Sequence, residues 1–158
     1  MLFLLFHLGK ERYVLEASRV VEVLPLLELK KFPQAPSGFA GIINYRGRPV
    51  PVIDLCELTL EEPAAERLST RIILMKYEHA HSGDRLVGLI AERATEMLRK
   101  APGEFIDPGF RSAHAPYLGP IVLDAAGAIQ WIKAEHLLTE KLPQLVFSDS
   151  LQLAHDSD

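Results

Sequence analysis

Short apolar runs separated by turn residues cover most of the chain. Residues 2–8 are hydrophobic at all but one position, so an extended backbone would direct apolar side chains to both of its faces. Strands with this pattern are buried on both sides. The pattern predicts a first strand held between two structural units.

A second pair of apolar runs, Phe39–Ile43 and Val50–Leu55, flanks a polar turn. This arrangement predicts a β-hairpin. Asn44 and Gly47 supply the residue types that tolerate the backbone angles of a tight turn. Arg46 then lies at the tip of the hairpin.

Two prolines, Pro49 and Pro51, lie in the second strand of this hairpin. Proline has no amide proton, so it belongs at strand starts, edges or bulges. We therefore expect this strand to be an edge of its sheet. An apolar edge is normally covered, either by another part of the chain or by a partner protein.

The remaining pattern predicts further short elements. They are a strand over Arg12–Ala17, a helical turn from Ser18 to Val21, strands over Thr70–Tyr77, Arg85–Ala91 and Glu92–Arg99, a hairpin of Tyr117–Leu123 with Ala128–Lys133, and a short helix over Ala134–Thr139. Glu57–Leu68 and Lys100–Pro116 read as loops, and Pro143–Asp158 as a tail whose acidic end frays. Many short strands without long helical periodicity predict an all-β barrel or sandwich.

Composition narrows the classes of function. The chain has 158 residues, enough for one domain or two small subdomains, and 48% of them are hydrophobic. Its 17 basic and 21 acidic residues give a net charge of −4, which offers no broad footprint for nucleic acid. The apolar start of residues 1–8 is too short for a signal peptide or a membrane span. We expect a cytoplasmic protein.

Candidate catalytic chemistry is sparse. The sequence contains no nucleophile-elbow, dinucleotide or phosphate-loop motif, and its six histidines lack metal-site spacing. His79 and His81 could chelate a metal, but solvated loop histidines are the favoured interpretation. Cys56 reads as a buried structural thiol, and Asp54 as an acceptor of backbone N–H groups where its strand ends. We expect no catalytic residue, cofactor or metal.

The stretch Gly41–Leu55 resembles the G-x-x-N-x-R-G-x-x-x-P-V-x-D-L signature of CheW-like domains, the chemosensory adaptors that couple receptors to a histidine kinase. The resemblance extends over roughly residues 3 to 138. Other segments match in the same order: Phe6–Leu15, Val20–Leu24, Pro33–Pro36, Arg71–Leu74 and Val87–Ile90.

The resemblance implies a fold of two intertwined five-stranded SH3-like β-barrels with short helices. Residues 1–142 would form a single CheW-like domain of two barrel subdomains, and residues 143–158 a partly disordered tail. The two-faced first strand fits this fold independently.

The resemblance also implies a non-enzymatic adaptor. It would couple the cytoplasmic signalling domain of a methyl-accepting chemoreceptor to the regulatory domain of a CheA-like histidine kinase, with other CheW-like adaptors as further partners. It would reach the inner membrane only through receptors. The implied receptor-binding residues are Val20, Glu22, Gly41, Asn44, Tyr45, Arg46 and Gly47. No kinase-binding residue is implied.

The residues alone leave alternatives open. An arginine at a turn tip is most often merely solvated, although interface hot spots are enriched in arginine. Glu22 could equally be an ordinary exposed strand or helix residue. A ligand-binding barrel with Lys100–Pro116 as a lid, or a self-assembling scaffold, is the alternative function; the first predicts a deep pocket near that loop.

The chain departs from the family pattern at several positions. Tyr45 stands where the family usually has leucine, Ala91–Ala94 replaces V-D-x-V, and residues 130–132 replace an aliphatic ending. These departures suggest an adaptor of an alternative pathway. Residues 117–120 and 129–132 resemble the Wsp-type surface-sensing systems, whose output is a cyclic-dinucleotide synthase.

Overall fold

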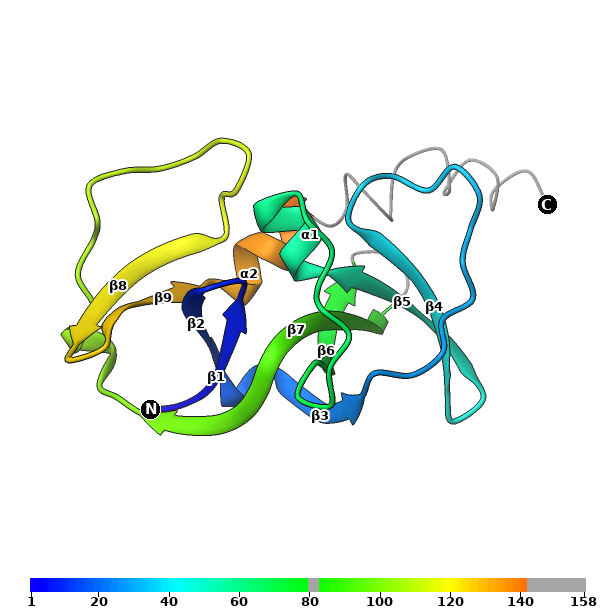
Figure 1. Cartoon of the computed structure of the whole chain (residues 1–158), viewed down its shortest axis with the longest axis horizontal. Helices are drawn as coiled ribbons and strands as arrows, with labels where there is room; N and C mark the ends of the chain where they lie inside the picture. Colours follow the sequence, from blue (N-terminus) through cyan, green and yellow to red (C-terminus); the bar gives the residue numbers. More distant parts are fainter. Residues whose placement is uncertain (80–82, 142–158) are drawn as a thin grey trace.

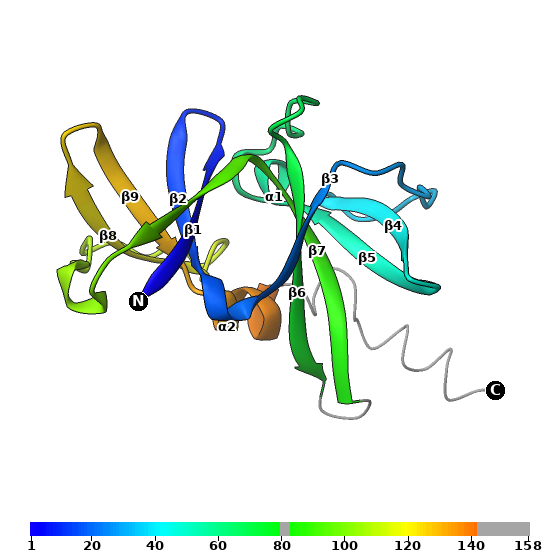
Figure 2. The same ribbon diagram turned by 90° about the horizontal axis from the view of Figure 1, so that it is seen from below.

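Strands dominate the computed structural model, which describes residues 1–79 and 83–141. Two barrels lie side by side, and the short helices α1 (Leu55–Leu60) and α2 (Ala134–His136) lie between them (Figures 1 and 2). The chain continues from α2 as a π-helical turn over Leu137–Lys141. Single 3-10 turns cover Ala17–Arg19 and Pro102–Glu104.

Each barrel takes strands from distant parts of the chain. Barrel A contains β1 (Leu2–Leu8), β2 (Glu11–Glu16), β8 (Leu118–Asp124), β9 (Gly127–Ile132) and the second half of β7 (Gly83–Arg99). Barrel B contains β3 (Val20–Pro25), β4 (Phe39–Tyr45), β5 (Arg48–Asp54), β6 (Arg71–His79) and the first half of β7. The expected architecture of two intertwined five-stranded SH3-like barrels is confirmed.

The long strand β7 joins the two barrels. Its first half pairs with β6 and, in parallel, with the end of β5, whereas its second half pairs with β1. The register with β1 shifts between Leu5 and His7, and Arg93 adopts a positive φ of 48° there. Such a bulge bends a strand. The segment Glu92–Arg99, predicted as a separate strand, is therefore the continuation of β7.

Three hydrophobic clusters form the interior. Core A, inside barrel A, contains Phe3, Val14, Phe105, Val122, Ile129 and Trp131. Core B, inside barrel B, contains Leu24, Ile43, Val50, Val52, Ile72, Leu74 and Ile90. The shared core lies between the barrels and includes Leu4, Phe6, Leu8, Leu15, Ile53, Leu55, Cys56, Ile73, Met75, Leu89, Ile132 and Leu137.

The first strand faces two of these cores. Phe3 packs into core A, while Leu4, Phe6 and Leu8 point into the shared core. The prediction of a first strand held between two structural units is confirmed. The second strand behaves similarly, because its Val14 is fully buried in core A.

The β4–β5 hairpin forms as predicted, but its turn differs in detail. Arg46 and Gly47 are the two central residues, and both have positive φ, 50° and 84°. This is the type I′ geometry that matches the twist of a hairpin. Asn44 contributes through its side chain, whose Oδ1 accepts the Gly47 N–H at 2.8 Å.

The prediction that β5 is an edge strand is wrong. Its residues Val52, Ile53 and Asp54 pair with β7, so only the half that carries Pro49 and Pro51 lacks a second neighbour among the described residues. The edge strands of barrel B are β3, which pairs with β6, and β4, which pairs with β5.

Other local predictions need correction. The 3-10 turn covers Ala17–Arg19 and contains Ser18, and Val20 already begins β3 because its backbone pairs with Met75. The predicted loop Glu57–Leu68 overlaps α1, whose first residues are buried in the shared core.

The C-terminal hairpin and short helix agree with the predictions, and residues 100–116 are irregular apart from one 3-10 turn. Phe105 from this loop packs against Phe3 and Trp131 in core A, with ring centroids 5.4 and 5.0 Å away. The start of the loop therefore fills the barrel. The predicted tail Pro143–Asp158 and His81 lie outside the described residues.

Candidate functional site

A seam runs along barrel B where its two edge strands, β3 and β4, face each other. No backbone pairing joins these strands in the described part of the chain. Glu22 on β3 and Tyr45 at the end of β4 meet across the seam, where the Tyr45 hydroxyl donates a hydrogen bond to Glu22 Oε1 at 2.7 Å. We call Glu22, Tyr45 and Arg46 the seam cluster.

The local sequence explains how Glu22 comes to face the seam. The pairing of β3 with β6 shifts register between Val20 and Glu22, which leaves Val21 as an extra, exposed residue. A bulge of this kind at a sheet edge changes the direction of the following side chain. The bulge therefore sets where the Glu22 carboxylate lies.

Arg46 reaches the same carboxylate from the hairpin tip. Its Nη2 atom lies 3.6 Å from Glu22 Oε1, and its guanidinium carbon lies 5.2 Å from the centroid of the Tyr45 ring. The Arg46 side chain is 77% exposed and the Glu22 side chain 39% exposed. Both charged groups are thus accessible to a partner, and the aromatic ring supports the guanidinium.

The electrostatics of the cluster favour a neutral phenol. The hydrogen bond to Glu22 raises the pKa of Tyr45 above its ordinary value of 10.0, with a smaller contribution from burial. Tyr45 therefore stays a hydrogen-bond donor at physiological pH. Exposed ion pairs add little to stability, so the Arg46 and Glu22 charges are available for recognition.

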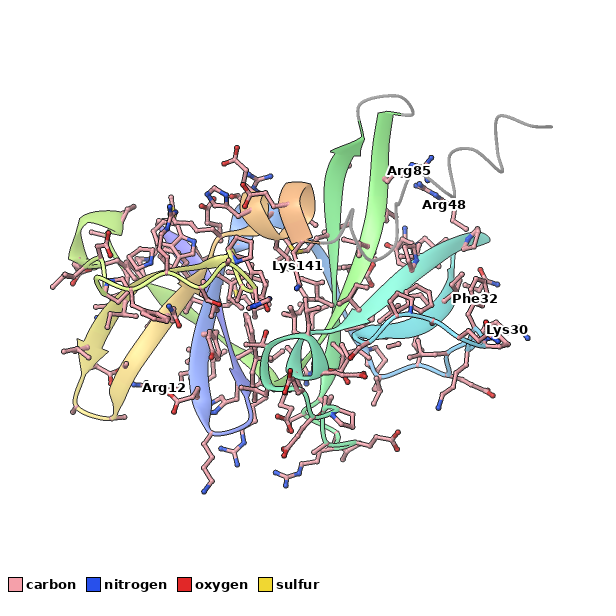
Figure 3. All side chains as sticks on the ribbon, turned by 90° about the horizontal axis from the view of Figure 1, so that it is seen from above. Arg12, Lys30, Phe32, Arg48, Arg85 and Lys141 are labelled. Atoms are coloured by element: carbon pink, nitrogen blue, oxygen red, sulfur yellow. The ribbon has the colours of Figure 1, made fainter. Side chains whose placement is uncertain are left out.

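Further cations lie near the seam cluster. Figure 3 shows Arg48 and Arg85 at the hairpin end of barrel B, whereas Lys30 and Phe32 lie at the other side of the hairpin. The parallel register of β5 with β7, in which Val52 pairs with Gly88, places Arg48 and Arg85 at similar levels of adjacent strands. This end of barrel B is rich in arginine.

The other predicted receptor-binding residues have different surroundings. Asn44 and Gly47 shape the turn that carries Arg46. Val20 is half-buried and packs against the shared core. Gly41 is buried, and a Cβ there would lie 2.7 Å from the carbonyl oxygen of Lys30. The structure thus brings Glu22, Tyr45 and Arg46 together, whereas Val20 and Gly41 contact other parts of the chain.

The need for glycine at position 41 has a clear structural cause. Lys30 and Ile42 exchange two backbone hydrogen bonds, at 2.8 and 2.9 Å, so the linker before β4 crosses the strand directly over Gly41. Its φ of 149° is also one that side-chain-bearing residues rarely adopt. Glycine here permits the close crossing of two backbones.

Sequence reasoning missed the junction between the barrels. Glu92 accepts hydrogen bonds from Gly9 N at 2.8 Å, Ala65 N at 3.1 Å and Cys56 Sγ at 3.3 Å. Burial raises the pKa of Glu92, but these donors outweigh it and hold the pKa below its usual value. Its position in an apolar strand was the available signal, because a carboxylate there needs partners.

Two residues at the start of α1 confirm predicted structural roles. Asp54 caps α1 by accepting the N–H groups of Cys56 and Glu57, and it also accepts that of Ala64. Burial raises the pKa of Cys56 to about 12, with a further contribution from Glu92, so the thiol is unreactive at neutral pH.

Within residues 1–79 and 83–141, no group of three or more His, Cys, Asp or Glu side chains is placed to hold a metal ion. Among the described residues, one surface hollow is lined mainly by residues of β1, β2 and β7, and another by the linker before β4, α1 and the loop after it. Neither is lined by the Lys100–Pro116 loop, the proposed lid of the alternative ligand-binding function. No helix in the described part of the chain is long and apolar enough to span a membrane.

Comparison with known proteins gives a consistent result. Residues 2–142 match the CheW-like domain family. The chain is 27% identical over 96 residues to the chemotaxis protein CheW of Klebsiella aerogenes, covering 61% of this chain and 55% of that protein. The matched region thus spans about half the length of that relative.

Two further comparisons cover more of the chain. Protein FrzA of Myxococcus xanthus is 27% identical over 160 residues, covering 96% of this chain and 86% of that protein. The crystal structure of the scaffolding protein TtCheW from Thermoanaerobacter tengcongensis superposes with a TM-score of 0.73 at 25% identity, covering 89% of this chain and 88% of that one.

Proposed function

Because the chain belongs to the CheW-like domain family, a family of non-catalytic chemosensory scaffolds, we propose that it is an adaptor. In this proposal it couples the cytoplasmic signalling domain of a methyl-accepting chemoreceptor to the regulatory domain of a CheA-like histidine kinase. It reaches the inner membrane only through the receptor. Residues 1–142 act as a single domain.

The observation that carries the receptor assignment is the seam cluster. It presents the exposed Arg46 guanidinium at the hairpin tip beside the accessible Glu22 carboxylate on β3, and both residues belong to the set that the family resemblance implies. Arginine has a five-donor fork suited to carboxylates on a partner helix. A helical receptor tip would dock against this surface as an amphipathic helix does in a groove.

The proposed contacts divide by role. Glu22 and Arg46 touch the receptor, Tyr45 orients them, Asn44 and Gly47 hold the turn, and Val20 and Gly41 lie in the strands that carry this surface. Kinase coupling would occur barrel against barrel, and other CheW-like adaptors could pair in the same way. We also propose a Wsp-type pathway, on the resemblance of residues 117–120 and 129–132, which lie in and next to β8 and β9.

Binding to the cytoplasmic signalling fragment of a receptor from the same genome tests the proposal. We expect Arg46→Ala and Glu22→Ala each to weaken binding about tenfold, or about 1.4 kcal/mol. Arg99→Ala, which removes an exposed arginine from barrel A, should bind as wild type does. Circular dichroism would verify that each variant is folded.

The outcomes separate the function from its site. If the wild-type protein binds but both substitutions are silent, the adaptor function stands and the receptor surface lies elsewhere. If the wild-type protein binds no receptor fragment, the adaptor proposal fails.

A further inference from the structure

The hydroxyl of Tyr45 links two strands that have no backbone link with each other. β3 pairs only with β6, and β4 only with β5 and the linker residue Lys30, among the described residues. The 2.7 Å bond from Tyr45 to Glu22 joins residues 23 positions apart across this seam. This hydrogen bond, which we call the clasp, therefore holds Glu22 against the hairpin.

The clasp occupies only one oxygen of Glu22. Oε1 accepts the Tyr45 hydroxyl and lies 3.6 Å from Arg46 Nη2, a separation too long for a hydrogen bond. No hydrogen bond ends on Oε2 in the part of the chain that the structure describes. A neutral donor thus fixes the carboxylate without cancelling its charge, and the guanidinium keeps its donors.

Tyr45 also competes with Arg46 for the same oxygen. The guanidinium sits against the Tyr45 ring, 5.2 Å from its centroid, while the hydroxyl occupies Oε1. A leucine at position 45, the residue usual in the signature, has no hydroxyl. The loose ion pair between Glu22 and Arg46 could then shorten to hydrogen-bonding distance. In this chain the two groups stay 3.6 Å apart, and each keeps hydrogen-bonding capacity for a partner.

We propose that Tyr45 is a specificity-determining, positioning residue, which keeps the Glu22–Arg46 ion pair loose and oriented, so that both charges remain available to a partner. The partner that fits such a pair is a helix with a carboxylate and a lysine or arginine one turn apart, because residues at i and i+4 lie about 6 Å apart on one helix face. The inference rests on the proposed receptor-binding function and names the chemistry that this surface selects.

The first measurement examines the free protein. In protein labelled with 13C at the tyrosine ring, the Tyr45 resonance, assigned with Tyr45→Phe, reports ionisation of the phenol. The bond to Glu22 holds the pKa of Tyr45 above its ordinary value, so Glu22→Gln should lower this pKa. An unchanged titration would show that the clasp does not form and would overturn the proposal.

The second measurement is affinity for the receptor fragment. Side chains that are already ordered lose less conformational entropy when a partner binds. Tyr45→Phe and Tyr45→Leu, which remove this ordering, should therefore each weaken binding about three- to tenfold. In a Glu22→Ala background, Tyr45→Phe should cause no further loss, because Tyr45 acts through Glu22. Additive losses, or wild-type affinity for Tyr45→Phe, would overturn the role of Tyr45.

A matched control exists elsewhere in the chain. Tyr117→Phe removes the hydroxyl that bonds Thr59 of α1 at 2.8 Å from the residue just before β8, at the junction of the barrels. It should leave affinity unchanged. Absence of binding by the wild-type protein would overturn the proposed function and the charge selectivity together, whereas the phenol titration would still report whether the clasp exists. The two failures are therefore distinguishable.

The order of the charges gives a third test. The double variant Glu22→Arg with Arg46→Glu keeps the net charge but reverses the pair. We expect more than tenfold weaker binding to the natural fragment. Retained affinity would contradict selection of a partner by oriented charges.

Discussion

Glu92 at the barrel junction and Glu22 at the seam are two carboxylates in contrasting surroundings. Glu92 accepts hydrogen bonds from three segments: the β1–β2 turn, α1 and the loop after α1. Among the described residues, Glu22 accepts one hydrogen bond, from Tyr45, and its side chain stays 39% exposed. One carboxylate accepts three donors of its own chain, and the other accepts one and keeps more capacity for groups from outside.

The difference separates architecture from recognition in this molecule. A partly buried acceptor such as Glu92, which joins several segments, stabilises their arrangement, and its loss leaves several donors unpaired. An exposed acceptor with one internal partner adds little to stability but can bind groups from outside. The junction therefore links the two barrels, while the seam leaves a carboxylate accessible at the surface.

The sharpest test of this contrast is Glu92→Ala. It would leave the N–H groups of Gly9 and Ala65 and the Cys56 thiol without their acceptor. We expect the free energy of unfolding to fall by about 3 kcal/mol, measured by chemical denaturation. Glu96→Ala removes an exposed glutamate four residues along β7 and should change it by less than about 0.5 kcal/mol. Equal stability of the two variants would contradict the role of the junction.

Replacing Gly41 tests whether this residue of the signature is needed for the stability of the fold. Its Cβ would clash with the Lys30 carbonyl, and its φ is unfavourable for alanine. Gly41→Ala should therefore lower the free energy of unfolding by about 2 kcal/mol. Gly103→Ala, where nothing lies within 4 Å, should be nearly neutral in the same measurement. A stable Gly41→Ala variant with lost receptor affinity would instead make Gly41 a contact residue.

The features that sequence predicted well are local. The β4–β5 hairpin follows from a turn with positive φ at Gly47, and the cap at Asp54 follows from a carboxylate at the end of a strand. The double burial of β1 was visible because its side chains are apolar on both faces. Each of these signals lies within a few consecutive residues.

The features that sequence missed depend on distant contacts. Helix α1 has only six residues, and it forms because Asp54 caps it and the shared core buries its first turn. β7 continues through both barrels because each half finds a different neighbour. The clasp of Tyr45 on Glu22 spans an unpaired seam, so no periodicity could place these two residues together.

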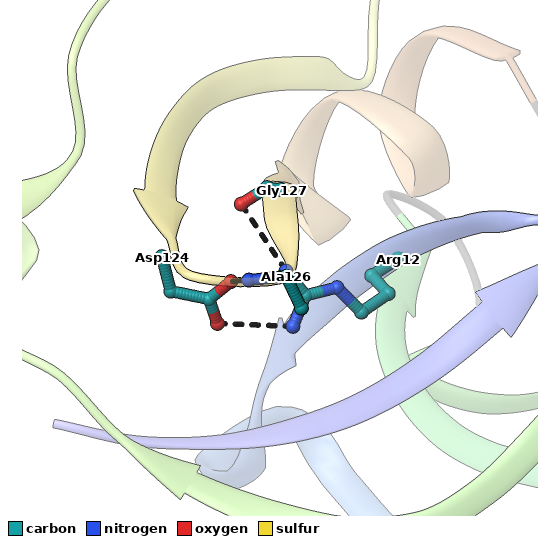
Figure 4. Close-up of polar contacts among 4 residues, drawn as sticks. All are labelled: Arg12, Asp124, Ala126 and Gly127. Atoms are coloured by element: carbon teal, nitrogen blue, oxygen red, sulfur yellow. Dashed lines mark hydrogen bonds and ion pairs between the residues drawn. The ribbon is translucent and has the colours of Figure 1, made fainter.

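Barrel A has its own side-chain link, which predicts a pH dependence. Arg12 on β2 donates to both carboxylate oxygens of Asp124 and to the carbonyl of Gly127, and Ala126 N–H also bonds Asp124 (Figure 4). The hydrogen bonds from Arg12, followed by that from Ala126, lower the pKa of Asp124 from 3.8 to about 2.

The sign of the effect follows from linkage. A carboxyl with a lowered folded-state pKa contributes stability above its unfolded value, and this contribution is lost as the pH falls through the folded-state pKa. The wild-type protein should therefore lose this contribution between pH 4 and pH 2, whereas Asp124→Asn should lack it throughout. Denaturant unfolding at several pH values would measure both. Parallel curves for the two proteins would contradict the prediction.

The smallest expected effect on stability is that of replacing Glu22, the carboxylate at the seam. Glu22→Ala removes an exposed carboxylate with one internal hydrogen bond, and we expect the free energy of unfolding to change by no more than about 0.5 kcal/mol. The same denaturation measurement serves as for Glu92→Ala. A loss comparable to that of Glu92→Ala would make the Tyr45 clasp necessary to close barrel B, so the seam would belong to the architecture. A negligible loss, combined with weakened receptor binding, would mean that this carboxylate is retained at the seam for its partner.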